Sequence, residues 1–228
     1  MSIFRTKSEN ISNVIYISTA LFIVAVLTHF LPIEIPYKLA FPLIILTTTS
    51  LWICPWQITC ALALSAVGDM FGTCGFLLGQ MGAFAAAHIF YIQFFTNRYR
   101  EKVRVNGKIA GKAAGYIFLI SFLGIVFASF IFTQITPEVP EGIIRAGASV
   151  YTLVICMMLM LALLQRSSLY AIGAILFTFS DFILAWNIFV DPIKGAGYLI
   201  MTPYYLGQWL LFIRSSPYRI SGIRIHRM

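Results

Sequence analysis

Charged residues are scarce in this chain. Only 11% of its 228 residues are Asp, Glu, Lys or Arg, and only 8 are acidic, whereas about a quarter of the residues in soluble domains are charged. Sixty per cent of the residues are apolar, and the mean hydropathy is +0.87. This composition argues against a soluble domain. It predicts one integral membrane domain over residues 1–228, with short basic tails at both ends.

Cysteine-based motifs are missing as well. The four cysteines form no CxxC pair and lie near no pair of histidines, so we interpret them as free thiols and expect no metal and no cofactor. The 16 basic residues lie between apolar runs, where they set membrane topology, and we expect no nucleic-acid partner. The partners we expect are the lipid bilayer and a lipid substrate, with no obligate protein partner.

Apolar runs separated by turn residues predict an all-α, polytopic transmembrane helix bundle with eight spans. The run 39–95 is too long for one span and is broken at 52–56 and at 72–75, which gives three helices, the first of them short. No small-residue cleavage site follows the first run, so we interpret it as a mature span. The other spans are expected at about 11–31, 113–132, 143–164, 170–190 and 196–213, with a basic loop at 97–112 and a loop rich in Pro and Glu at 136–142.

The placement of basic residues tests this count independently. With the N-terminus inside, 13 of the 16 Lys and Arg residues lie in inner segments, and 3 lie in outer ones: Lys38, Arg145 and Lys194. This asymmetry satisfies the positive-inside rule. We therefore expect both termini in the cytoplasm, the basic tail 214–228 resting on anionic lipid headgroups, and a multi-pass protein of a bacterial inner (cytoplasmic) membrane.

Two aspartates lie inside the apolar runs. Asp69 is the only acid or base other than histidine between Lys38 and Arg98, and Asp181 lies in the similarly apolar seventh run. At 1.5 Å per helical residue, both fall roughly 16 to 18 Å from the inner face, near the middle of the bilayer. An isolated carboxylate in hydrocarbon is costly, so we predict that the two aspartates meet and have a function. The alternative is an interhelical hydrogen bond alone.

Other polar side chains fall in the same layer or share a helix face with one that does. His88 and Gln208 lie at a similar depth, while Ser65, Tyr91 and Tyr204 are one helical turn from Asp69, His88 and Gln208, respectively. Each also has a plain structural interpretation. Ser65 and Ser180 can bond to their own helix backbone, the tyrosines can be interface anchors, and His88 can be a packing residue. Lys38, at the outer start of the second span, can merely extend its amine to the membrane surface.

Four short elements, in their order and spacing, resemble the YhhN-like lysoplasmalogenase family. They are Ser65-x-x-Gly68-Asp69, then Gly82-x-Phe84-x-x-x-His88-x-x-Tyr91, then Phe177-x-x-Ser180-Asp181, and Tyr204-Tyr205-x-x-Gln208. The resemblance extends over about 38–212. One departure concerns Lys38, because the family opens this span with Lys-Pro, whereas three residues separate Lys38 from Pro42 here.

The resemblance implies an eight-helix membrane hydrolase that cleaves the vinyl ether bond of lysoplasmalogens to a fatty aldehyde and a glycerophospho-alcohol. The residues suit that chemistry, because protonation of a vinyl ether carbon and capture of the cation by water require one acid and one base. We expect Asp69 and Asp181 to supply both. The expected positioning residues are His88, Tyr91, Ser65, Ser180, Gln208, Tyr204, Tyr205 and Lys38.

Other functional classes compete with this interpretation. A small transporter or channel is one, because Asp69 and Asp181 both lie in the third span of their half of the chain, as in a parallel repeat. Against it, we expect no mid-helix Gly or Pro break apart from the Pro55 turn. A hydrolase of another lysolipid ether or ester is a second alternative. A structural or partner-binding membrane protein is a third, disfavoured because the notable polar residues are buried and the loops are short.

Overall fold

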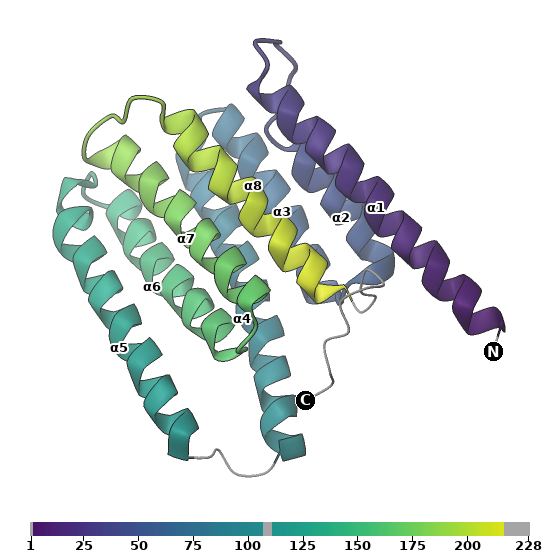
Figure 1. Ribbon diagram of the computed structural model, residues 1–228. Helices are drawn as coiled ribbons and strands as arrows, with labels where there is room; N and C mark the ends of the chain where they lie inside the picture. The colour runs from purple at the N-terminus through teal and green to yellow at the C-terminus, as the bar shows by residue number, and fades with distance from the viewer. Residues whose placement is uncertain (1, 107–110, 217–228) are drawn as a thin grey trace.

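The computed structural model describes residues 2–106 and 111–216 of the chain. In these residues the fold is all-helical, with eight α-helices, one short 3-10 helix and no strand (Figure 1). The elements are α1 Ser2–Phe30, α2 Phe41–Ile53, α3 Trp56–Thr73, α4 Leu77–Asn106, α5 Gly111–Gln134, η1 Thr136–Glu138, α6 Ile143–Leu164, α7 Ser168–Phe189 and α8 Ala196–Ser215. The predicted all-α fold is confirmed.

Five helices are long and apolar enough to cross a membrane by length and composition. These are the spans within α1, α4, α5, α6 and α7. Helix α2, with 13 residues, is shorter but equally apolar. The count of eight spans and the cytoplasmic position of both ends therefore stay predictions.

Proline and glycine separate the first helices where the sequence predicts breaks. Pro55 precedes α3, and Cys54 ends the α2 region with its backbone N–H bonded to the carbonyl of Ser50. Gly75 has a φ of +70°, a left-handed conformation that suits glycine, and it turns the chain between α3 and α4. Helices α3 and α4 consequently form a hairpin.

The predicted basic loop 97–112 is wrong for most of its length. Helix α4 continues to Asn106, because Arg, Glu and Lys are good helix formers and no Gly or Pro interrupts 97–106. The part of that loop at 107–110, including Lys108, lies outside the described residues. So does most of the predicted lipid-binding tail, namely 217–228.

Helices α7 and α8 pack backbone against backbone. A Cβ added at Gly207 would lie 2.8 Å from the carbonyl oxygen of Gly173, and one added at Gly173 would lie 3.1 Å from that of Gly207. Only small residues permit so close an approach of two helix backbones. Pro203 lies inside α8, but the helix runs unbroken past it, so it is not a mid-helix break.

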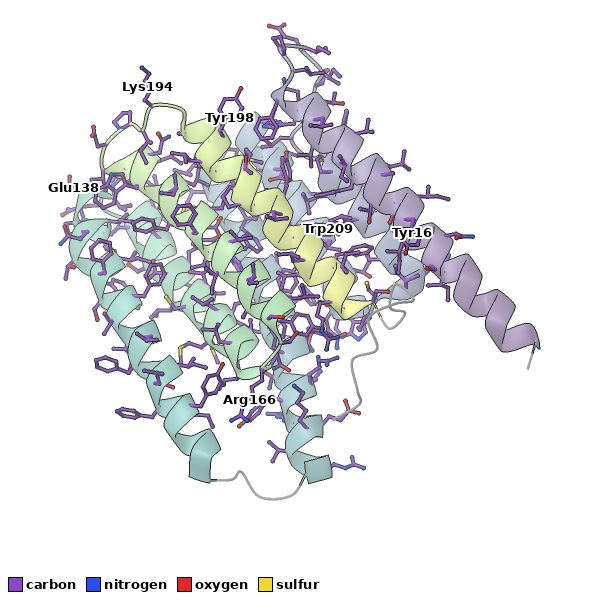
Figure 2. The ribbon with its side chains drawn as sticks, in the orientation of Figure 1. Tyr16, Glu138, Arg166, Lys194, Tyr198 and Trp209 are labelled. Atoms are coloured by element: carbon purple, nitrogen blue, oxygen red, sulfur yellow. The ribbon has the colours of Figure 1, made fainter. Side chains whose placement is uncertain are left out.

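Successive helices run up and down, and α1 and α5 lie at the two flanks of the bundle (Figure 1). Glu138 and Lys194 lie at one end, and Arg166 lies at the opposite end (Figure 2). Following the predicted orientation, we call the end with Lys194 the outer end and the end with Arg166 the inner end. The apolar core between these ends includes Leu62 of α3 and Phe177 of α7.

Candidate active site

Asp181 is held by residues from two other helices. Its Oδ2 accepts a 2.6 Å hydrogen bond from the hydroxyl of Tyr151 in α6. Nε2 of His88 in α4 lies 3.2 Å from the same Oδ2 and 3.2 Å from the Tyr151 hydroxyl. Asp181 is 7% exposed and His88 is fully buried. An ionised Asp181 therefore has its charge stabilised by two neighbouring donors when the His88 proton is on Nε2.

Asp69 has a separate partner. It lies in the second-last turn of α3, and its Oδ2 accepts a 3.0 Å hydrogen bond from the hydroxyl of Tyr204 in α8. Asp69 is 2% exposed and Tyr204 is 3% exposed, so the pair is shielded from solvent. The two carboxylates therefore belong to two separate hydrogen-bond networks.

Aromatic rings lie between the two networks. The Phe84 ring lies edge-on to Tyr204 and to Phe177, with centroids 5.9 and 6.5 Å away. The Phe177 ring is 4.6 Å from the His88 ring. These rings make the region between the two networks largely apolar.

Both aspartates line one cavity of about 280 Å³, which we call the central cavity. It lies among α3, α4, α7 and α8, and its wall also includes Gln80, Ser180 and Tyr204. Leu39, just before α2, and Gly197, in the first turn of α8, line it as well, and both belong to the outer end of the bundle. The prediction that Asp69 and Asp181 face a common space is confirmed.

A second, smaller cavity, of about 70 Å³, adjoins the first. We call it the lateral cavity; it is bounded by α4, α5, α6 and α7. The two cavities share five lining residues: Gln80, Phe84, Asp181, Leu184 and Ile188.

Gln208, Tyr91 and Ser65 form a third network, which does not line either cavity. Tyr91 donates a 2.7 Å hydrogen bond to Oε1 of Gln208, and Nε2 of Gln208 donates a 3.0 Å hydrogen bond to the hydroxyl of Ser65. All three residues are fully buried. The expectation that Gln208 faces the same cavity as the aspartates is therefore wrong, and His88 likewise lies behind Asp181 rather than in a cavity wall.

The remaining predicted residues differ in position. Ser180 lines the central cavity, and its hydroxyl donates to the carbonyl of Ile200 in the neighbouring helix rather than to its own. The hydroxyl of Tyr205 donates to the carbonyl of Leu39 at 2.8 Å. Nζ of Lys38 donates to the carbonyls of Leu31 and Ile33 in the loop before α2, and Lys38 lines neither cavity.

Two cavity residues escaped the sequence analysis. The sequence analysis did not identify Tyr151, because tyrosines in membrane proteins are usually interface anchors. The one feature that could have indicated a role is its position eight residues into a predicted span. Gln80 lines both cavities, and its side-chain amide makes no hydrogen bond with the described part of the protein. It lies against Gly72, where an added Cβ would be 2.6 Å from Nε2 of Gln80.

The chemistry available at the site follows from its composition. No Lys or Arg is among the described residues that line the two cavities, so no permanent cation neutralises the two carboxyls there. Carboxyl, hydroxyl, amide and imidazole groups can transfer protons and position water. Buried carboxyls that have no Lys or Arg partner, one of them beside an imidazole, suit acid–base catalysis.

Most of the chain, from the end of α1 onward, is similar to known proteins. A model of the YhhN family matches residues 30–215. The chain is 32% identical to lysoplasmalogenase TMEM86B of Homo sapiens over 153 residues, which are 66% of this chain and 59% of that protein. It is 30% identical to lysoplasmalogenase TMEM86B of Sus scrofa over 68% of this chain and 62% of that protein, and 30% identical to the Mus musculus protein over 75% and 67%. No solved structure matches the chain.

Proposed function

The chain belongs to the YhhN family, and from that premise we propose that it is a membrane lysoplasmalogenase. The proposal adds to the family membership one observation of the structure, the shared cavity wall that holds Asp69 and Asp181. Relatives named lysoplasmalogenase support the activity, while the alignments with the human and pig proteins cover less than two thirds of those proteins.

The proposed reaction consumes one water. A proton adds to the β-carbon of the vinyl ether, and the C=C electrons form that C–H bond and leave an oxocarbenium ion. Water adds to the α-carbon and loses a proton, which gives a hemiacetal. The hemiacetal C–O bond then breaks: the ether oxygen takes up a proton and leaves as the alcohol of the glycerophospho group, while the hemiacetal hydroxyl loses its proton and becomes the carbonyl of the fatty aldehyde. No electron acceptor is consumed.

Asp69 and Asp181 act in this proposal as one acid–base unit. One carboxyl donates the proton to carbon while the other, ionised, accepts the proton of the attacking water, as in the paired carboxylates of glycoside hydrolases. An ionised carboxylate in the cavity also stabilises the positive oxocarbenium ion. Tyr204 orients Asp69, and Tyr151 and His88 orient Asp181, through the hydrogen bonds described above.

The test uses purified protein in detergent, without a gradient or a protein partner. A lysoplasmalogen is supplied, and free aldehyde and glycerophospho-alcohol are both quantified. Equimolar release by the wild type, and none by Asp69→Asn, supports the proposal. Release of fatty acid from a 1-acyl lysophospholipid, without aldehyde from the vinyl ether lipid, would replace it with an ester hydrolase. If the protein turns over neither lipid, the transporter is favoured over both hydrolases.

The membrane arrangement forms part of the same proposal. All eight helices cross or enter the bilayer as one domain of a cytoplasmic membrane, with both termini in the cytoplasm. The charge distribution among the described residues supports this orientation, because Arg98, Arg166 and Arg214 lie at the inner end. The substrate's polar group then enters at the outer end, where the central cavity reaches Leu39 and Gly197.

A further inference from the structure

The lateral cavity is apolar except where it meets the central cavity. Thr152 donates its hydroxyl hydrogen bond to the carbonyl of Ala148, and Thr136 donates to the carbonyl of Ile131. These hydroxyls are thus already engaged by their own backbone. The rest of its wall away from the junction is hydrocarbon, from α4, α5, α6 and α7.

The polar groups of the lateral cavity gather at one side. Asp181 and Gln80 are shared with the central cavity, and Tyr151 bonds to Asp181. The central cavity has a different character, because Asp69, Ser180 and Tyr204 add polar atoms to its wall. A ligand with one hydrocarbon end and one polar end matches this division, provided that its polar–apolar boundary lies beside Asp181.

We propose that the lateral cavity binds the single hydrocarbon chain of the lysolipid, while the central cavity binds its glycerophospho part. The assignment rests on the proposed function, since a vinyl ether bond joins those two parts and is then held at the junction beside Asp181. Gln80, with an amide that has no partner in the described protein, faces both parts from α4. The wall of the lateral cavity therefore selects the chain length, and the wall of the central cavity selects the headgroup.

Two alanines belong to the wall of the lateral cavity alone. Ala148 of α6 and Ala185 of α7 line it and do not line the central cavity. A phenyl ring at either position extends into existing space, so it occupies room that the chain would use. Ala148→Phe should lower kcat/KM for a lysoplasmalogen with a long chain by at least about tenfold, and should spare one with a short chain, because each lost methylene contact is worth roughly tenfold or more.

Matched variants separate this effect from general damage. Val150→Phe adds the same ring on the exposed face of α6, where Val150 is 58% exposed, and should leave the chain-length profile unchanged. Gly197→Leu fills the central cavity from α8, where an added Cβ meets no atom within 4 Å, and should alter the headgroup preference instead. Ala185→Phe places the same ring in the lateral cavity from α7 and is expected to have the same effect. It is the second variant to use if Ala148→Phe folds poorly.

The decisive measurement is the ratio of kcat/KM for long and short chains in each folded variant. A fall in that ratio for Ala148→Phe or Ala185→Phe, but not for Val150→Phe, supports the inference. Equal slowing on both chains, with an active wild type, overturns it and leaves the proposed function standing. If the wild type turns over no vinyl ether lipid, a saturated alkyl-ether lysolipid with a photoreactive group near its chain end tests binding alone. Crosslinks at the lateral cavity walls of α6 and α7 support the inference, and crosslinks confined to lipid-facing residues overturn it.

Discussion

The hydroxyl of Tyr151 lies 2.6 Å from Oδ2 of Asp181, and that short contact joins α6 to α7 beside the junction of the two cavities. The same oxygen is 3.2 Å from Nε2 of His88 in α4. Residues of α4, α6 and α7 thus fix the position of one carboxylate. Asp69, in contrast, has the single side-chain partner Tyr204.

Tyr151→Phe is expected to slow turnover without unfolding the protein. The phenyl ring keeps the packing but removes the donor that orients Asp181, so we expect kcat to fall roughly 10²-fold, as for other positioning groups, with a small change in KM. Steady-state kinetics with a lysoplasmalogen measure both constants. Tyr16→Phe is the control, since Tyr16 is 49% exposed on α1 and should have little effect on either constant. An unchanged kcat in Tyr151→Phe would show that the contact does not serve catalysis.

His88→Ala should cost less than loss of either aspartate, again roughly 10²-fold in kcat, because His88 reaches the cavity only through Asp181 and Tyr151. The variant also leaves a void beside Phe177, whose ring is 4.6 Å away. His88→Gln fills part of that void with a donor, so partial recovery of kcat would identify the hydrogen bond as the important feature. Equal activity of the alanine variant and the wild type would reduce His88 to a packing residue.

Gln208→Leu is expected to destabilise the fold rather than to abolish the chemistry. The change leaves the hydroxyls of Tyr91 and Ser65 buried without their partner, which should lower the free energy of unfolding by about 1 to 3 kcal/mol. A lower midpoint of thermal unfolding in detergent measures this. Gln93→Leu, at an exposed position of α4, is the matched control. If the activity per folded molecule vanished while the midpoint held, Gln208 would belong to the catalytic machinery after all.

The sequence predicted which polar residues lie within the apolar helices, but not how each helix is rotated against its neighbours. Isolation of Asp69 and Asp181 in apolar runs placed them in the membrane interior, and Pro55 and Gly75 marked the helix ends, because both signals are local. Whether a side chain faces a cavity depends on how each helix is turned against its neighbours. For this reason the sequence placed Gln208 in an apolar helix but did not predict that it bonds to Tyr91, away from the central cavity.

Residues with ambiguous chemistry were missed for the same reason. Tyr151 and Gln80 carry no charge, so burying them costs far less than burying an aspartate, and nothing in the sequence sets them apart from other membrane tyrosines and glutamines. The inner end of α4 was misread on a different ground. Its basic residues suggested a loop, yet charged residues such as Arg and Glu are good helix formers, and α4 continues through them to Asn106.

Cys74 offers a direct test of orientation. It follows α3 in the turn before α4, and it is the one exposed cysteine among the four. If the turn faces outward, a membrane-impermeant maleimide should label Cys74 in intact cells. With Cys74→Ser as the background, Arg100→Cys, at an exposed position near the other end of α4, should react only after the cells are made permeable. The reverse pattern would invert the proposed topology.

The sharpest prediction concerns the two aspartates together. Asp69→Asn and Asp181→Asn keep the shape of the carboxyl and can still form hydrogen bonds, but an amide neither donates nor accepts the catalytic proton. Each variant should lose nearly all turnover, at least about 10²-fold, while remaining folded. Because the two groups serve one transition state, the double variant should be little worse than either single one, so that the losses do not add. Kinetics of the four proteins, with the midpoint of thermal unfolding as the control for folding, give this comparison. Additive losses would indicate that each aspartate acts independently, and a single variant with more than about a tenth of wild-type turnover would leave its aspartate only the role of a structural hydrogen bond.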